Sequence, residues 1–187
     1  MIRLLTFFFL FCYSYSFGQI ENSQTCRIEF YLLKMVRPNL DTTKNLRGEF
    51  LVTKNDLADT AFIKDVEIYS YSILRDTTRS THRQNIIEEH HKFNVNNATT
   101  HRINNLNIPL CCGRQFALVV NGQIAYVGYF WNLRSSFGSD WITAFSHNTY
   151  IDVMRKLPDY DFATDSNDPR INHLLFECLN STNRLTK

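Results

Sequence analysis

The chain has 187 residues, of which 44% are hydrophobic and 20% charged, and its formal net charge at pH 7 is +2. This length allows one domain with a substantial core. Removal of the single base in the first 18 residues leaves 19 Lys and Arg against 18 Asp and Glu, a balance that argues against the basic surface of a nucleic-acid-binding protein.

The N-terminal residues have the pattern of a signal peptide. Arg3 precedes an apolar run at residues 4–11, and small residues end the segment at Gly18. The run is far shorter than the ~20 apolar residues that a membrane-spanning helix needs. We therefore expect a signal peptide over residues 1–18 and a single domain over residues 19–187, periplasmic or secreted, with no membrane span once the leader is removed.

Four cysteines remain after the leader, namely Cys26, Cys111, Cys112 and Cys178. In an oxidising compartment an even number of cysteines favours disulfide bonds. Adjacent cysteines bridge each other only with strain, so we expect Cys111 or Cys112 to bond with Cys26 or Cys178. The alternative is a metal site that joins the adjacent cysteines to His90 and His91, but this spacing suits zinc poorly, and no metal or cofactor is expected.

The first half of the mature chain is rich in strand patterns. Branched and aromatic residues predict strands at 26–36 and 49–53, and alternation predicts another at 64–74. The polar residues 75–84 favour a loop. Residues 86–95 are ambiguous, with strand character at 92–95.

A short helix is expected at residues 97–106. Asn97 is a suitable N-cap, and Ile103 and Leu106 lie on one helical face. Pro109 follows and cannot continue the helix.

Residues 114–131 read RQFALVVNGQIAYVGYFW, two apolar runs around Asn121-Gly122. This pair is the strongest short signal of a hairpin, because a type I′ turn needs positive φ at both central residues. A regular ladder would pair Val120 with Gln123, Val119 with Ile124, Leu118 with Ala125, Ala117 with Tyr126 and Phe116 with Val127. Both faces would then be apolar, so the hairpin is either central and covered on both sides or has one side open to a partner. Gly128 predicts a bulge or the close approach of a ring or backbone.

Aromatic residues follow the hairpin, and a further strand is expected at residues 141–145. Tyr129, Trp131 and Trp141, with Arg134 beside them, could form an exposed rim for a sugar, peptide or protein. Packing in the core is the other use of these rings.

The C-terminal part contains an acidic loop and then a helix at residues 168–180. Asp168 is a suitable N-cap and Pro169 suits the first helical position. One apolar stripe comprises Ile171, Leu174, Leu175, Cys178 and Leu179. We expect this stripe to pack on the sheet with Cys178 pointing inward.

These elements predict an α+β fold, an antiparallel sheet of about five or six strands with a central Asn-Gly hairpin and helices packed on it, including the C-terminal helix. The succession of the helix at 97–106, Gly113 and the strand that ends at Asn121-Gly122 resembles the head subdomain of the periplasmic P1 region of SecD. Asn121 stands where that family has Asp, and the membrane helices of SecD are missing. The resemblance implies an α+β envelope domain rather than translocation. The chain is also similar to small secreted proteins of Bacteroidetes, whose leaders often end just before a Gln such as Gln19.

The function expected from the sequence is that of an exported, non-enzymatic domain that binds a protein or glycan in the cell envelope through Tyr129, Trp131, Trp141 and Arg134. The alternative is a hydrolase-like enzyme that uses Ser135 or Ser136 with a histidine. No nucleophile motif such as G-x-S-x-G supports that alternative, so no catalytic residue is assigned.

Overall fold

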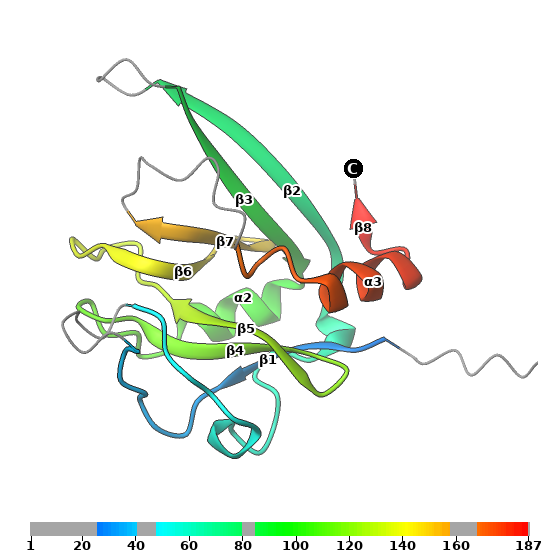
Figure 1. The fold of residues 1–187 in the computed structure, drawn as a ribbon, viewed down its shortest axis with the longest axis horizontal. Helices are drawn as coiled ribbons and strands as arrows, with labels where there is room; N and C mark the ends of the chain where they lie inside the picture. The colour runs from blue at the N-terminus through cyan, green and yellow to red at the C-terminus, as the bar shows by residue number, and fades with distance from the viewer. Residues whose placement is uncertain (1–25, 41–47, 80–84, 158–167, 187) are drawn as a thin grey trace, which may run out of the picture.

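The computed structural model describes residues 26–40, 48–79, 85–157 and 168–186, so the predicted signal peptide lies outside the described part (Figure 1). The described residues form one sheet, two α-helices and two short 3-10 helices. The strands are β1 (Ile28–Leu32), β2 (Ile68–Arg79), β3 (Asn85–Val95), β4 (Arg114–Val120), β5 (Gln123–Phe130), β6 (Ser139–Ser146), β7 (Tyr150–Leu157) and β8 (Leu185–Thr186). The helices are η1 (Lys54–Asp56), η2 (Asp65–Glu67), α2 (Asn97–Asn104) and α3 (His173–Ser181).

The sheet has eight strands in the order β1-β4-β5-β6-β7-β3-β2-β8. β5 pairs with β6 in parallel, and β2 pairs with β8 in parallel, whereas the other neighbours are antiparallel. The mixed α and β content agrees with the predicted class. The prediction of an antiparallel sheet of about five or six strands holds only in part. The sheet has eight strands, and two of its neighbouring pairs are parallel because the chain crosses over after β5 and again at its C-terminal end.

β4 and β5 pair across Asn121 and Gly122, which have φ angles of +50° and +75°. Val119 lies opposite Ile124 as expected, but Leu118 lies opposite Tyr126, because Ala125 is an extra residue in β5. The shift places Gly128 opposite Phe116, where a Cβ atom on Gly128 would lie 2.9 Å from the Phe116 ring. The predicted pairing beyond Ile124 is therefore wrong, and the close approach predicted for Gly128 is confirmed.

One face of the sheet is covered by the two α-helices. Its core contains the rings of Phe30, Phe93 and Phe116, and the centroid of Phe30 lies 5.3 Å from that of Phe93 and 5.4 Å from that of Phe116. Ile103 of α2 and Leu175 of α3 belong to the same cluster. Aromatic pairs at these separations add favourable edge contacts to the burial of apolar surface.

The opposite face is covered by residues 48–57, which were expected to include a strand at 49–53. These residues have no strand assignment, yet Phe50 is buried and its ring lies 5.1 Å from that of Tyr129. The strand prediction was wrong because apolar residues such as Phe50 pack on the sheet as part of an irregular segment and do not pair with another strand. The hairpin is therefore covered on both sides.

β2 and β3 are longer than expected. β2 continues through residues 75–79, which were assigned to a loop, and β3 covers the whole ambiguous segment. A register shift between Ile68 and Ser70 brings Ile68 and Tyr71 to the buried side, against the simple alternation predicted. Figure 1 shows the two strands leaving the rest of the sheet together as a ribbon.

Both α-helices begin at other caps than expected. Asn96, not Asn97, caps α2 and accepts from Thr99 N at 2.7 Å. Asn172 caps α3, because the Asp168 carboxylate is bound to Arg170 instead. The predicted inward stripe of α3 holds for Leu175, Cys178 and Leu179, whereas Ile171 is exposed.

The structure pairs Cys26 with Cys178, whose Cα atoms lie 5.3 Å apart. Cys111 bonds with Cys112. The expectation that one of the adjacent cysteines reaches Cys26 or Cys178 is therefore wrong, because the two distant cysteines meet each other under α3. The bond between Cys26 and Cys178 joins the two ends of the described chain.

None of the helices in the described segments has the length and apolar character that a membrane span requires.

Candidate functional site

The predicted aromatic rim is not formed by the residues proposed for it. Tyr129 is 1% exposed and Trp131 is 4% exposed, because both belong to the core under residues 48–57. Trp141 is half-buried and donates its indole N–H to the carbonyl of Val127 at 2.9 Å. Arg134 is exposed. The structure thus does not bring the four residues together as an exposed binding surface.

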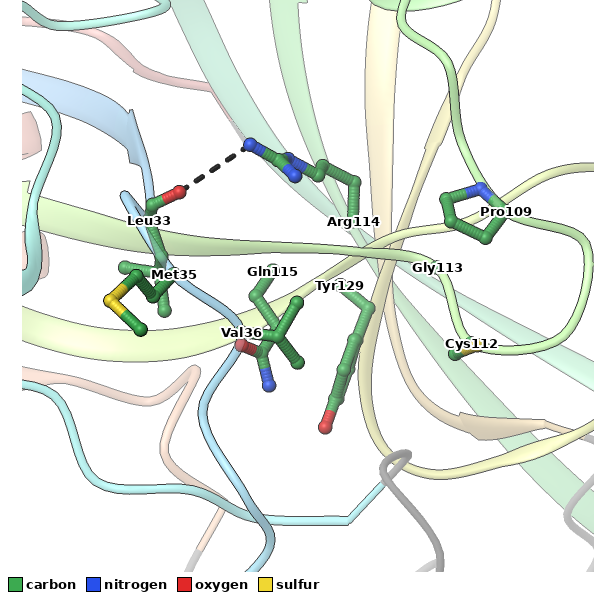
Figure 2. Close-up of a pocket in the computed structure, with 9 residues that line it drawn as sticks. All are labelled: Leu33, Met35, Val36, Pro109, Cys112, Gly113, Arg114, Gln115 and Tyr129. Carbon is green, nitrogen blue, oxygen red and sulfur yellow. Dashed lines mark hydrogen bonds between the residues drawn. The ribbon is translucent and has the colours of Figure 1, made fainter.

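An apolar hollow lies instead between the segment after β1 and the loop that leads into β4 (Figure 2). Its lining comprises Leu33, Met35, Val36, Pro109, Cys112, Gly113, Arg114, Gln115 and Tyr129. The volume of the hollow is about 100 Å³. Sites for drug-sized ligands have volumes of about 300–1,000 Å³, so the hollow is the size of a side chain rather than of a cofactor.

Gln115 holds the two walls of the hollow together. Its amide oxygen accepts from the backbone N–H of Arg37 at 2.6 Å, and its amide nitrogen donates to the carbonyl of the same residue at 2.9 Å. Arg37 is also paired with the buried carboxylate of Asp56. These contacts fix residues 33–37 beside the start of β4, although β1 has ended at Leu32.

The polar groups of the lining are already engaged. The Tyr129 hydroxyl donates to the carbonyl of Gly48 at 2.8 Å, and burial raises the pKa of Tyr129 to about 12. Arg114 directs its guanidinium at the carbonyl of Leu33, 3.4 Å away, as Figure 2 shows. What remains for a ligand is mainly carbon surface.

Large apolar side chains lie in solvent at the edge of this hollow. Met35 is 71% exposed and Val36 is 60% exposed, and Leu110 of the facing loop is also exposed. Scattered exposed apolar residues are normal, but a group beside an apolar hollow is typical of an interaction site.

Ser135, one of the two serines proposed as nucleophiles, has another role. The Ser135 hydroxyl donates to the carbonyl of Leu110 at 2.5 Å and so ties two surface loops together. Ser136 is exposed. In the described chain, His91 bonds to Tyr71 and Glu89, and His147 stacks on Tyr150, so the contacts of these histidines lie elsewhere.

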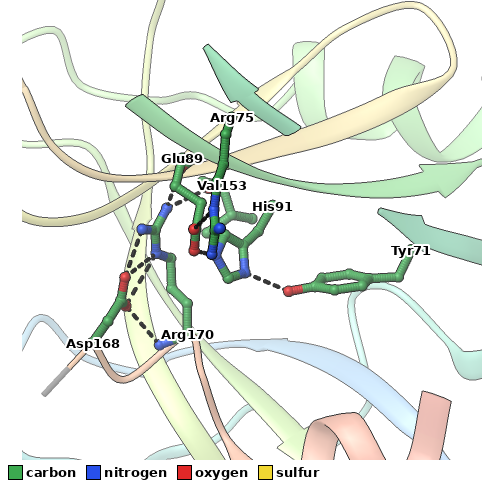
Figure 3. Close-up of polar contacts among 7 residues, drawn as sticks. All are labelled: Tyr71, Arg75, Glu89, His91, Val153, Asp168 and Arg170. Atoms are coloured by element: carbon green, nitrogen blue, oxygen red, sulfur yellow. Dashed lines mark hydrogen bonds and ion pairs between the residues drawn. The ribbon is translucent and has the colours of Figure 1, made fainter. Parts of the chain in front are cut away.

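A second group of polar residues is buried between β2, β3 and the segment before α3 (Figure 3). The Tyr71 hydroxyl donates to His91 Nδ1, and His91 Nε2 donates to Glu89 Oε1 at 2.8 Å. Arg170 binds both carboxylate oxygens of Asp168 and donates to the carbonyls of Glu89 and Val153. This polar network joins four segments of the chain, namely β2, β3, β7 and the residues before α3.

The network holds His91 neutral. Burial is the largest cause that lowers the pKa of His91, the charge of Arg170 adds to it, and the result is a pKa of about 4. Burial also raises the pKa of Tyr71, which keeps its proton for His91. For Asp168, burial alone would raise the pKa, but the hydrogen bonds and charge of Arg170 outweigh it and lower the pKa.

Glu89, His91 and Asp168 bring possible metal ligand atoms within 4.8 Å of one another. Each of these side chains is nevertheless already used. His91 donates from Nε2 and accepts at Nδ1, while Arg170 supplies the positive charge beside Asp168. Tyr71 and His91 are also fully buried, and hydrogen bonds within the network satisfy their polar atoms.

Sequence reasoning missed both groups. The hollow combines residues 33–36 with residues 109–115 and Tyr129, and these segments share no local motif. The polar network depends on Arg170, but the sequence analysis assigned its partner Asp168 to a helix cap instead. The alternating pattern at residues 64–74 predicted that Tyr71 lies in a strand. Nothing in the sequence indicated that His91 would pair with Ile73, two residues beyond Tyr71.

Comparison with models of known protein families found no match, and no curated protein matched the chain either.

Proposed function

We propose that the protein is an exported, non-enzymatic domain that binds a protein partner through the apolar hollow beside Met35 and Val36. The observation that carries this proposal is the combination of a side-chain-sized hollow with exposed apolar residues at its edge. A partner would insert one large apolar side chain into the hollow and cover Val36. Anchors of this kind contribute most of the free energy of many protein interfaces.

A protein partner fits the hollow better than a glycan does. Sugar recognition needs free donors and acceptors for hydroxyl groups, whereas the amide of Gln115 and the hydroxyl of Tyr129 are already hydrogen-bonded within the chain. The carbon-rich lining gains free energy when water leaves it. A partner's Leu, Met or Phe would supply that apolar surface.

The hydrolase alternative has less support. A catalytic serine needs a base within hydrogen-bond reach, and the Ser135 hydroxyl is engaged with the backbone of Leu110. The buried chain of Tyr71, His91 and Glu89 resembles a relay of protons, but its Tyr and His are fully buried. A binding domain accounts for the exposed residues without requiring chemistry.

The test is a selection of random peptides, displayed on phage, against the immobilised mature protein. Selected peptides are expected to share a large apolar residue and to bind Val36→Asp at least about tenfold more weakly than the wild type, because a buried anchor would face a charge. Ile171→Asp is the matched control, since Ile171 is 59% exposed and Val36 is 60% exposed.

The proposal is contradicted if the selected peptides bind Val36→Asp as tightly as the wild type. It is equally contradicted if Ile171→Asp causes the same loss, because the effect would then not belong to the hollow. A glycan array supplies the other arm, and sugar binding that survives Val36→Asp would favour the glycan alternative.

A further inference from the structure

The loop between α2 and β4 carries a disulfide bond between sequence neighbours. The Cα atoms of Cys111 and Cys112 lie 3.8 Å apart. Cys111 is exposed, and Cys112 is half-buried at the wall of the hollow (Figure 2). The two residues of this bond thus differ in their access to solvent.

The bond between Cys111 and Cys112 contributes little to the stability of the fold. A disulfide restrains the unfolded chain in proportion to the logarithm of the length of the loop that it closes, and the ring closed by neighbours contains no intervening residue. The bond between Cys26 and Cys178, in contrast, spans 152 positions and is buried, with the two residues 7% and 3% exposed. The chain therefore holds a structural disulfide and a second one that needs another explanation.

The loop around the neighbouring cysteines is held by contacts that do not use their sulfurs. Gly113 donates its N–H to the carbonyl of Pro109 at 3.2 Å, and Ser135 donates to the carbonyl of Leu110. Gly113 has a φ of +65° and is packed so closely that a Cβ atom would lie 2.7 Å from the Trp131 ring. The sulfur–sulfur bond can consequently open while both ends of the loop keep their places.

We propose that Cys111 and Cys112 form a thiol–disulfide exchange site whose reactant is a dithiol, and that the reactant attacks Cys111. Access decides which sulfur is attacked, and exposed disulfides are the labile ones. This inference is independent of any partner at the hollow, because it uses only the exposure and adjacency of the two cysteines.

The exchange transfers two electrons. A thiolate of the dithiol attacks Cys111 Sγ, the bond between the two cysteines breaks, and Cys112 leaves as a thiolate that takes up a proton. The second thiolate of the reactant then attacks the reactant's own sulfur in the mixed disulfide and releases Cys111 as a thiolate, which is also protonated. The reactant is oxidised to its cyclic disulfide and the pair is reduced to two thiols.

The first experiment uses the two disulfides of the same folded chain as target and control. The mature protein is treated with dihydrolipoate, samples are alkylated with iodoacetamide over time, and each cysteine is mapped by mass spectrometry. Cys111 and Cys112 are expected to become alkylated about 100-fold faster than Cys26 and Cys178. Equal rates, or earlier alkylation of Cys26 and Cys178, would overturn the proposal.

A second experiment tests which sulfur reacts. With oxidised glutathione, Cys112→Ser is expected to accumulate a stable mixed disulfide at Cys111, about tenfold faster than Cys111→Ser does at Cys112. The reduced wild type should instead return to the internal bond, because Cys112 displaces the glutathione. Equal rates in the two variants would refute attack at Cys111, and a persistent mixed disulfide in the wild type would refute the role of Cys112. Circular dichroism should show that both variants keep the fold.

Discussion

Acid should destabilise this protein through His91 before its carboxylates become protonated. His91 has a pKa of about 4 in the folded chain, chiefly because it is buried, whereas an unperturbed histidine has a pKa of about 6.5. Between these pH values the unfolded chain binds a proton that the folded chain does not. Stability is therefore greatest above pH ~6.5 and falls as the pH is lowered toward ~4.

The size of the effect follows from the difference between the two pKa values. At about 1.4 kcal/mol for each pH unit, the contribution of His91 is roughly 3 kcal/mol. Glu89 and Asp168, whose folded pKa values are lowered, act in the same direction but at lower pH, because they lose stability only as the pH falls below their unfolded values. The interval between pH 6.5 and 4.5 thus reports mainly on histidine.

Urea denaturation of the mature protein at constant ionic strength, from pH 7.5 to 4.5, measures this dependence. His91→Gln is the informative variant, because its amide can accept from Tyr71 and donate to Glu89 but does not titrate. The wild type should lose stability more steeply than His91→Gln as the pH falls, and most of the calculated difference should be present at pH 4.5. Parallel curves for the two proteins would refute the reasoning.

Further predictions concern the disulfide, two glycines and a helix cap. Replacing Cys26 and Cys178 by Ser should lower the free energy of unfolding by up to about 5 kcal/mol, the chain-entropy value for a bridge spanning 152 positions, and urea titration would measure it. Gly128→Ala should cost about 1–3 kcal/mol, since its methyl carbon would meet three core atoms at 2.9 Å, and a cost near zero would contradict the packing. Gly122→Ala should lower the free energy of unfolding by about 1 kcal/mol for a different reason. An added methyl group would meet no other atom of the described residues, but the φ of +75° is strained for alanine, so smaller neighbouring side chains should not restore the stability. Asn172→Ala should cost about 1 kcal/mol through the lost cap of α3, and thermal unfolding should detect a lower midpoint.

Local patterns predicted the elements whose cause is local. Asn121 and Gly122 adopt positive φ because the two-residue turn demands it, whatever the rest of the chain does. The same reasoning failed four residues later, at Ala125. Both faces of β5 are apolar, so the pattern held no information on which residue would bulge out of the ladder.

Tertiary contacts decided the elements that the sequence did not predict. Asp168 has the right chemistry for a helix cap, but Arg170 engages its carboxylate and Asn172 takes the cap. Residues 75–79 looked like a loop because they are polar, yet the ladder with β3 keeps them extended. Phe50 has strand-like neighbours but fills the core as part of an irregular segment.

The candidate site could be predicted from the sequence only in part. The sequence left both core and exposed rim open for the aromatic residues after the hairpin, and burial decides for the core at Tyr129 and Trp131. The hollow could not be predicted, because its walls meet through contacts between distant positions, such as that of Gln115 with Arg37, 78 positions away. All four cysteines predicted to form disulfides are bonded, but their pairing depends on where α3 packs.

The binding role of the hollow is tested most directly by methyl NMR of the mature protein during titration with a selected peptide. The largest shift changes are predicted at the methyl groups of Leu33, Met35 and Val36, with little change at the exposed control residue Ile171. Saturable changes that are centred on Ile171, and that leave the three methyl-bearing residues of the hollow unaltered, would contradict the proposed function.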